Sequence, residues 1–451
     1  MGEQVVRRIL SPLLLVVATL ASACGPKLSE ARSDAAAIVP TGGPVVSDEP
    51  SGPGVTDTEI KIGFIIVDQT NLKKLLQFDS PDVGDVKGQI ETLVATVNAE
   101  GGIAGRQVKP VIVVYDALTD SPDNEEKLCR TFTEDDPVFA VVLYGQVQSN
   151  ARPCYAERST MMIDQTFYPV DQASLDDFAP YLWQPIMPEY GKLLRGLAKA
   201  LDDNDFFDAE SRLGVIGLDS PENRRVYEVD LAPTLDRLGV PVADVQWIDS
   251  TSGATLQAGQ DQAVLEWKSL GVNRVIVVGG SRLLAFLVTT AIPQEFFPRY
   301  AITSFDNPDF LKREMPMSLE GSVGISIQAA FDVADTEYPR PGNAAEQWCI
   351  DTLAAGGHEF VERANSREAL IYCDAVRLLQ QAGAALTGRA VTADAMAAAI
   401  TALGSDWQSA SNYSSTFQPG AFDGVAGFRA TLWEPSCGCF VLTDETSEFP
   451  S

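Results

Sequence analysis

The sequence is poor in basic residues and in histidine. Its 451 residues include 33 lysines and arginines against 62 aspartates and glutamates, and His358 is the only histidine. Nucleic-acid binding requires clustered lysine and arginine side chains at the phosphates. The chain has no such cluster, so we expect no nucleic-acid partner. We interpret the net charge of −29 as an acidic, solvated surface, with an acidic docking surface as the alternative.

Motifs for catalysis, nucleotide binding and metal binding are also missing. The sequence has no G-x-S-x-G turn, no Walker A loop and no G-x-G-x-x-G fingerprint after a strand. A nucleophile paired with histidine is unsupported, because the single histidine lies in the C-terminal part of the chain. We therefore expect that the chain is not an enzyme. Paired C-x2-C spacings are absent as well, so we expect neither a metal nor another cofactor.

The N-terminal residues predict export. Arg7 and Arg8 precede an apolar run over residues 9–20, and three small residues then lead to Cys24. This is the order of a signal peptide, which we place at residues 1–23. The cysteine after small residues resembles a bacterial lipobox. That resemblance implies a lipid on the cysteine and an extracytoplasmic chain anchored to the cell membrane, and an ordinary signal peptide with an incidental cysteine is the alternative.

The next segment has the composition of a linker. Residues 24–56 are rich in alanine, serine, glycine, proline and acids, and they almost lack aromatic side chains. Such a segment buries too little apolar surface to fold, so we interpret it as a lipidated, disordered tether. No later apolar run reaches the length of about 20 residues that spans a bilayer. We therefore expect the rest of the chain to lie outside the membrane.

Six cysteines remain after Cys24. An even number in an exported chain predicts disulfides, although six cysteines allow 15 connectivities. The simplest pairing joins neighbours along the sequence. The expected bonds are Cys129–Cys154, Cys349–Cys373 and Cys437–Cys439. The third would enclose only Gly438 and form a tight, strained ring.

From residue 59 onward, strand-like and helix-like segments alternate. Residues 60–68 (IKIGFIIVD) form a β-branched apolar run, as expected for a strand covered on both faces. Residues 88–100 (GQIETLVATVNAE) carry apolar side chains at helical spacing. A second series in the same order begins near residue 212. Strands alternating with helices predict βαβ units, so the expected fold class is α/β with two doubly wound parallel-sheet lobes.

A glycine-rich stretch carries a family resemblance. Residues 98–108 (NAEGGIAGRQV) read as a turn between a helix and a strand, because glycine accepts the left-handed backbone that ends a helix. The longer stretch 98–116 resembles the signature of type I solute-binding proteins of the leucine/isoleucine/valine and amide class. Residues 318–326 (SLEGSVGIS) and 368–386 (EALIYCDAVRLLQQAGAAL) are similar to that family's recrossing segment and long C-terminal helix.

The resemblance implies an architecture and a role. The family has two lobes joined by three crossing segments that act as a hinge, and it holds its ligand in the cleft between them. The expected first lobe comprises residues 57–184 and 331–418, and the second comprises residues 185–330 and 419–448. The implied partners are a small-molecule solute and the membrane subunits of an ABC permease, and we expect a monomer.

Ligands of open parallel sheets bind beyond the carboxyl ends of the strands. The candidate ligand-binding residues therefore follow the predicted strands: Asp68, Gln69, Gln146, Ser149, Gln165, Thr166, Asp219, Ser281 and Asp306. By position, Ser149 and Thr166 match the family's groups for an amino-acid carboxylate. Asp306 is the nearest match to the carboxylate that pairs with the ligand ammonium.

Two loops depart from the family pattern. The sequences VDQTNLKK and YGQVQSNARP carry amides and charges where the family has small hydroxyl residues. This favours a ligand that needs more amide hydrogen bonds, or no ligand at all, over a plain branched-chain amino acid. Several candidates also have a local alternative role. The alternative for Ser149 is a helix cap, for Asp219 and Asp306 a turn at the end of a strand, and for Gln165 and Thr166 a hydrogen bond to loop backbone only.

Two function hypotheses result. The first is a lipid-anchored protein that captures a small polar solute, such as an amino acid or an amide, and delivers it to an ABC permease. The second is a tethered sensor or cell-envelope interaction protein that kept the fold and lost transport. An open cleft lined by polar residues favours the first hypothesis, whereas a cleft filled by Phe167 or Tyr168 favours the second.

Overall fold

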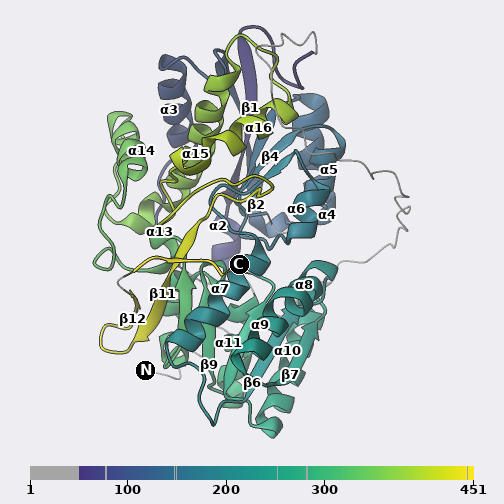
Figure 1. The fold of residues 1–451 in the computed structure, drawn as a ribbon, viewed down its shortest axis with the longest axis vertical. Helices are drawn as coiled ribbons and strands as arrows, with labels where there is room; N and C mark the ends of the chain where they lie inside the picture. Colours follow the sequence, from purple (N-terminus) through teal and green to yellow (C-terminus); the bar gives the residue numbers. More distant parts are fainter. Residues whose placement is uncertain are drawn as a thin grey trace.

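The computed structural model describes residues 50–76, 79–146, 148, 150–250, 252–280, 283–443 and 445–450. Two sheets, each flanked by helices, lie end to end along the long axis of the molecule (Figure 1). The α/β class with two largely parallel sheets is as predicted. Within the described residues, none of the helices combines the length and the apolar character needed to cross a membrane.

The first sheet has five parallel strands in the order β2-β1-β3-β4-β5. The inner strand β1, between β2 and β3, is buried from Ile62 to Val67, as its apolar run predicts. The strands are β1 Glu59–Asp68, β2 Gln107–Asp116, β3 Ala140–Leu143, β4 Met161–Asp164 and β5 Leu182–Trp183. Helices associated with this half are α2 Thr70–Leu76, α3 Val86–Ala99, α4 Pro122–Arg130, α5 Ala151–Glu157, α6 Gln172–Asp177, α14 Ala344–Ala355, α15 Arg363–Gly383 and α16 Ala393–Leu403.

The second sheet has a parallel body and an antiparallel edge. Its order is β12-β11-β10-β9-β8-β6-β7, and β11 runs antiparallel to both β10 and β12. The strands are β6 Leu213–Leu218, β7 Val242–Ile248, β8 Arg274–Val278, β9 Arg299–Thr303, β10 Val323–Ser326, β11 Gly427–Glu434, β12 Cys439–Leu442 and β13 Ser447–Glu448. The helices are α7 Tyr190–Asp203, α8 Pro221–Val226, α9 Ala232–Leu238, α10 Gly253–Leu270, α11 Leu283–Ala291, α12 Pro308–Glu314 and α13 Ala329–Asp332.

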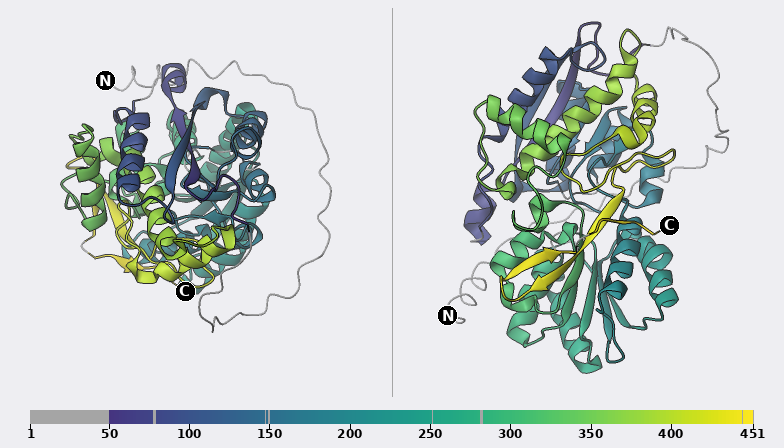
Figure 2. Two further views of the ribbon diagram at one scale, coloured as in Figure 1. Left: turned by 90° about the horizontal axis from the view of Figure 1, so that it is seen from above. Right: turned by 60° about the vertical axis from the view of Figure 1, so that its left-hand side comes forward.

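The chain passes between the two halves three times. It leaves the first sheet after β5, returns after β10, and crosses again before β11, so that the C-terminal strands lie with the second sheet (Figure 2). The three crossings are bonded to one another. Asn412 Nδ2 donates to the carbonyls of Ile186 (3.0 Å) and Ile327 (3.2 Å), and Gln328 Nε2 donates to Ile186 (3.0 Å).

The glycine-rich stretch forms the predicted turn between α3 and β2. Gly102 adopts φ +77°, and a Cβ atom there would lie 1.9 Å from the carbonyl oxygen of Arg106. Ile103 between the glycines is buried. The turn therefore requires glycine for steric reasons, and the stretch has a structural role.

Residues 50–56, at the end of the predicted tether, lie against the first half of the molecule. The backbone N–H of Gly52 donates to the Val391 carbonyl at 2.8 Å. The carbonyl of Thr56 accepts a hydrogen bond from Arg106 Nε at 2.7 Å. Composition does not reveal such bonds, because their partners are distant in sequence.

The three predicted disulfides are confirmed. Cys129–Cys154 joins α4 to α5, and Cys349–Cys373 joins α14 to α15. Cys437–Cys439 closes the tip of the hairpin between β11 and β12. The first two therefore join neighbouring helices on the first sheet, whereas the third lies within a single turn.

Candidate functional site

Loops at the carboxyl ends of strands from both sheets meet in the middle of the molecule. Phe167, shortly after β4, packs against Phe305, shortly after β9, with ring centroids 6.1 Å apart, and against Phe331 of α13 at 4.8 Å. A Cβ atom at Gly280, just after β8, would lie 2.9 Å from Cδ of Pro169. The carboxyl edges of the sheets therefore face each other. We call the contact between these five residues the seam.

Phe167 occupies the seam in a strained conformation. Its φ is +56°, a left-handed value that is rare for a bulky residue and costs roughly 1–2 kcal/mol. Its side chain is half-buried. The Thr166 hydroxyl oxygen supports the turn by accepting a hydrogen bond from the Tyr168 N–H at 3.3 Å. Phe167 thus fills part of the space that the solute-capture hypothesis assigns to a ligand.

An ion pair also joins the two halves beside the seam. Arg225 Nε of α8 donates to Asp171 Oδ2, at the start of α6, over 2.7 Å. Burial opposes ionisation of Asp171, but hydrogen bonds from Arg225 and Ser174 outweigh it and hold the pKa of Asp171 below its ordinary value. The protein's own side chains therefore bridge the two halves in this structure.

A buried network supports the first sheet at the seam. Arg152 Nε donates to Asp164 Oδ2 at 2.6 Å, and Asp164 is fully buried. The Thr166 hydroxyl donates to Asp164 Oδ1 at 2.8 Å and accepts a hydrogen bond from Arg152 Nη2 at 3.2 Å. The predicted ligand residue Thr166 therefore serves its own loop. Sequence analysis missed Arg152 and Asp164, because only the topology brings the helix residue to the strand end.

Gln165 lies between Asp164 and Thr166 in the sequence, but its side chain is not part of their hydrogen-bond network. Its side chain is fully buried, and neither its Oε1 nor its Nε2 has a hydrogen-bond partner among the described residues. A buried amide without partners costs about 1–3 kcal/mol. Of the predicted ligand residues that the structure describes, Gln165 is the one whose whole polar group is buried and left unused.

Gln146 belongs to a second buried cluster near the end of β3. Its Nε2 donates to Glu125 Oε2 of α4 at 3.1 Å. Burial raises the pKa of the Glu125 carboxyl to about 7. The remaining Oε1 atoms of both residues have no partner in the described part of the chain, and neither has the Tyr155 hydroxyl. Glu125 was not predicted, since it lies in an acidic helical segment that suggests a solvated face.

On the second sheet, Asp306 bonds within its own turn. Its Oδ2 accepts hydrogen bonds from the backbone N–H (2.8 Å) and the hydroxyl (2.9 Å) of Thr303. Burial raises the pKa of Asp306 to about 7, and that of the neighbouring Asp332 likewise to about 7. Asp332 Oδ2 accepts hydrogen bonds from the hydroxyls of Ser304 and Ser326. Asp332 was missed because it lies in a crossing segment.

The other candidates lie in their own loops or outside the description. Asp68 accepts a hydrogen bond from the Thr70 N–H at 2.8 Å at the start of α2, and hydrogen bonding to Thr70 lowers the pKa of Asp68. Gln69 is half-buried beside it. Asp219 is exposed and accepts a hydrogen bond from Arg224 Nε at 2.7 Å, which lowers its pKa. Cys24, Ser149 and Ser281 lie outside the described residues.

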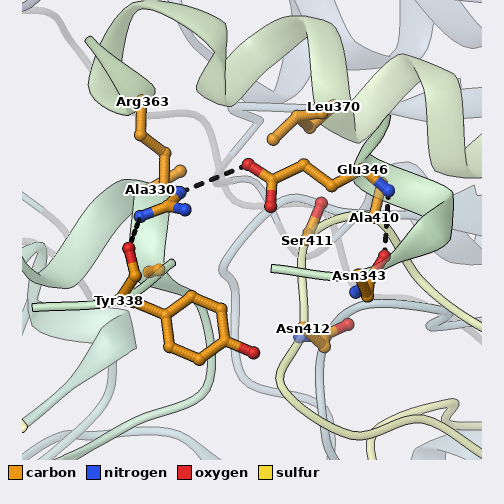
Figure 3. A pocket seen from close by; sticks show the side chains of 10 residues that line it. Ala330, Tyr338, Asn343, Glu346, Arg363, Leu370, Ala410, Ser411 and Asn412 are labelled. Atoms are coloured by element: carbon orange, nitrogen blue, oxygen red, sulfur yellow. Dashed lines mark hydrogen bonds and ion pairs between the residues drawn. The ribbon is translucent and has the colours of Figure 1, made fainter. Parts of the chain in front are cut away.

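Two cavities of the described structure are lined by residues other than those of the seam. One, of about 10 Å³, is bordered by Glu346, Arg363 and Asn412 beside the crossing segments (Figure 3). Arg363 Nε donates to Glu346 Oε1 there at 3.3 Å. This volume holds about one water molecule. The other is an open groove of about 510 Å³ between α14 and α15, beside Trp348 and Arg377.

Metal ligands do not gather anywhere in the described chain. Within those residues, no group of three or more His, Cys, Asp or Glu side chains is placed to hold a metal ion. The seam itself consists of three aromatic rings with Pro169 and Gly280, and the strand ends beside it carry the unpartnered amide of Gln165 and carboxyl groups that are already hydrogen-bonded.

Comparison with known proteins gives fold neighbours. No protein-family model and no curated protein matches the chain. Among solved structures, a branched-chain amino acid ABC transporter protein from Thermus thermophilus with bound valine has a TM-score of 0.60 and 16% identity, covering 87% of this chain and 97% of its own. A solute-binding protein from R. palustris in complex with 4-hydroxybenzoate has a TM-score of 0.61 and 15% identity, covering 87% and 98%.

A third solved structure with a similar fold is named for a different kind of ligand. The fatty acid ABC transporter substrate-binding protein from Thermomonospora curvata has a TM-score of 0.59 and 15% identity, covering 88% of this chain and 94% of its own. The chain therefore has the fold of ABC transporter substrate-binding proteins. The resemblance to the leucine/isoleucine/valine class is confirmed at the level of the fold.

Proposed function

We propose that the chain is an extracytoplasmic substrate-binding protein, anchored through a lipid on Cys24, that closes two lobes on a small solute. It delivers the solute to the membrane subunits of an ABC permease and acts as a monomer. The solute is a small polar molecule, such as an amino acid or an amide. The facing carboxyl edges at the seam and the shared fold support this proposal.

The observation that carries the proposal is the unpartnered amide of Gln165. Buried polar groups in proteins are nearly always hydrogen-bonded, and an exception calls for a ligand or an ordered water. Gln165 is fully buried, lacks a described partner and stands two residues before the seam ring Phe167. A guest that takes the place of this ring is expected to bind the amide.

Phe167 then acts as a displaceable plug. When the lobes separate, its ring leaves Phe305 and its backbone can relax from the left-handed region. A solute shifts the balance between open and closed states only through a difference in affinity for the two states, so it must contact both lobes. The amide of Gln165 on the first sheet and the groups after β8 and β9 on the second would supply these contacts.

Thermal unfolding in the presence of candidate solutes tests the proposal. The panel includes amino acids, amides, 4-hydroxybenzoate and a fatty acid. A solute at 100 times its dissociation constant should stabilise the protein by about 2.7 kcal/mol. Gln165→Leu removes the amide at similar volume and should abolish that stabilisation. Asp351→Asn, at an exposed position on α14 that is not among the candidate ligand-binding residues, is the control and should retain it.

The alternative function is a tethered sensor or cell-envelope interaction protein. It is favoured by the filled seam and by the Asp171–Arg225 ion pair, which close the lobes without a guest. If no solute stabilises either the wild-type protein or a Phe167→Ala variant, solute capture is wrong and this alternative stands.

A further inference from the structure

The hairpin between β11 and β12 carries a disulfide unlike the other two. It lies at the outer edge of the second sheet, away from the seam (Figure 1). Cys437 is exposed and Cys439 is half-buried, whereas the four cysteines of the other disulfides are at most 4% exposed. A reagent in solution therefore reaches this disulfide first.

The loop that this disulfide closes is too short for a large stabilising role. Cys437 and Cys439 are two positions apart, against separations of 25 and 24 for the other pairs. A disulfide stabilises mainly by restricting the unfolded chain, and the restriction grows with loop length. The hairpin also has its own supports. Trp433 pairs with Phe440 across the strands, and their rings pack at 5.1 Å.

The approach to the disulfide is open. Gly438, between the two cysteines, has φ +60°, and a Cβ atom there would meet no atom within 4 Å. Its N–H donates to the Glu434 carbonyl at 3.0 Å, so the turn is held by the backbone as well as by sulfur. Opening the sulfur–sulfur bond therefore leaves the hairpin paired.

We propose that Cys437–Cys439 is a redox site that oxidises dithiols of another molecule. A thiolate of the dithiol attacks the exposed Sγ of Cys437, the bond between the two cysteines breaks, and Cys439 leaves as a thiolate and takes up a proton. In the mixed disulfide, the first sulfur of the dithiol is bonded to Sγ of Cys437. The second thiolate of the dithiol attacks that first sulfur, and Cys437 leaves as a thiolate. The dithiol loses two electrons and becomes a disulfide, and the cysteine pair is reduced. Exposed disulfides belong to the class that undergoes such exchange.

The first test uses the two buried disulfides as internal references. The full-length protein is equilibrated in mixtures of reduced and oxidised dithiothreitol, free thiols are alkylated, and each cysteine is read by mass spectrometry. We expect Cys437 and Cys439 to become reduced at a ratio of reduced to oxidised reagent at least tenfold lower than Cys129 and Cys154. A tenfold difference corresponds to about 30 mV for this two-electron couple. Reduction of all pairs at the same ratio would overturn the proposal.

The second test follows transfer to a partner. A reduced peptide with two cysteines should become oxidised in one equivalent by the wild-type protein. The Cys439→Ser variant has a free Cys437 thiol. This thiol is first converted to a mixed disulfide with a small disulfide reagent, and it should then form a stable mixed disulfide with a one-cysteine peptide. Cys437→Ser, which keeps only the half-buried thiol, is the control and should react at least tenfold more slowly. Equal rates, or no oxidation of the peptide by the wild-type protein, would contradict a redox role. Thermal unfolding of both variants checks that they fold.

Discussion

At the seam, the edge of the first sheet contains a buried ion pair, whereas the edge of the second contains two buried carboxyl groups with raised pKa values. Arg152 supplies the positive charge to Asp164 on the first edge. On the second, Asp306 and Asp332 are held by hydroxyl and backbone groups, and burial favours their protonated forms. Similar βαβ topology therefore leads to two different ways of burying an acid.

The difference shows which edge depends on charge and which depends on pH. A buried carboxylate that is bonded to a guanidinium depends on that cation, because loss of the cation leaves a buried charge without its partner. A buried carboxyl without such a cation is ionised only at a desolvation cost, and its turn becomes sensitive to pH. The three predictions below set the two edges against each other.

The largest effect is expected from Arg152→Met. The substitution leaves the Asp164 carboxylate buried and unpaired, so the free energy of unfolding should fall by about 3–5 kcal/mol in urea denaturation. Arg224→Met removes the corresponding cation from the exposed Asp219 after β6 and should cause no measurable change. Equal losses at both positions would show that burial does not distinguish the two pairs.

Asp306→Asn should have a pH-dependent effect of intermediate size. Because the pKa of Asp306 is raised to about 7, its stabilising contribution is full below about pH 4 and is lost as the pH rises through about 7. The asparagine of the variant keeps a side-chain oxygen that can accept the hydrogen bonds from Thr303, and it does not ionise, so its stability does not fall in this pH range. Its melting temperature should exceed that of the wild type at pH 8 by an amount equivalent to about 1–3 kcal/mol, and the gain should shrink at pH 5.

The control for this profile is Asp219→Asn. The pKa of Asp219 is lowered, so the stability it contributes is present above about pH 4 and is lost as the pH falls further. Its effect should have the opposite sign and be small, because the group is exposed. A gain for Asp306→Asn that does not vary with pH would contradict the assigned protonation state.

The smallest effect compares two aromatic residues across the seam. Phe167 has a left-handed backbone, so Phe167→Gly should be more stable than Phe167→Ala by about 1 kcal/mol. Phe305 lies in a short helical turn and should show the usual order, with Phe305→Ala the more stable. Denaturant midpoints of the four variants measure both differences. The same order at both positions would mean that Phe167 is not strained.

The elements of the fold could be predicted because their signals are local. The apolar run of β1, the helical spacing of α3 and the glycines before β2 each identify one element, and the order of elements then gives two parallel sheets. Neighbouring cysteines paired as expected, since each of the first two pairs joins adjacent helices. The antiparallel pairing of β11 with β10 and β12 was not predicted and became known only from the structure.

The site was predicted less well, because its contacts depend on distant residues. The pairing of Arg152 with Asp164 and the packing of Phe167 on Phe305 follow from the folded arrangement and have no sequence signature. Asp306 is different. The sequence TSFD from Thr303 to Asp306 matches a helix-capping pattern, so its role within its own turn could have been found locally.

Residues 50–56 have a mechanical consequence for an anchored protein. They enter at the amino-terminal end of β1, whereas the seam lies at the carboxyl ends of the strands, and they are held there by bonds to Val391 and Arg106. A pull along the preceding chain would therefore act on the remote rim of one lobe only. It would not act directly on the three crossing segments, which lie between the two sheets.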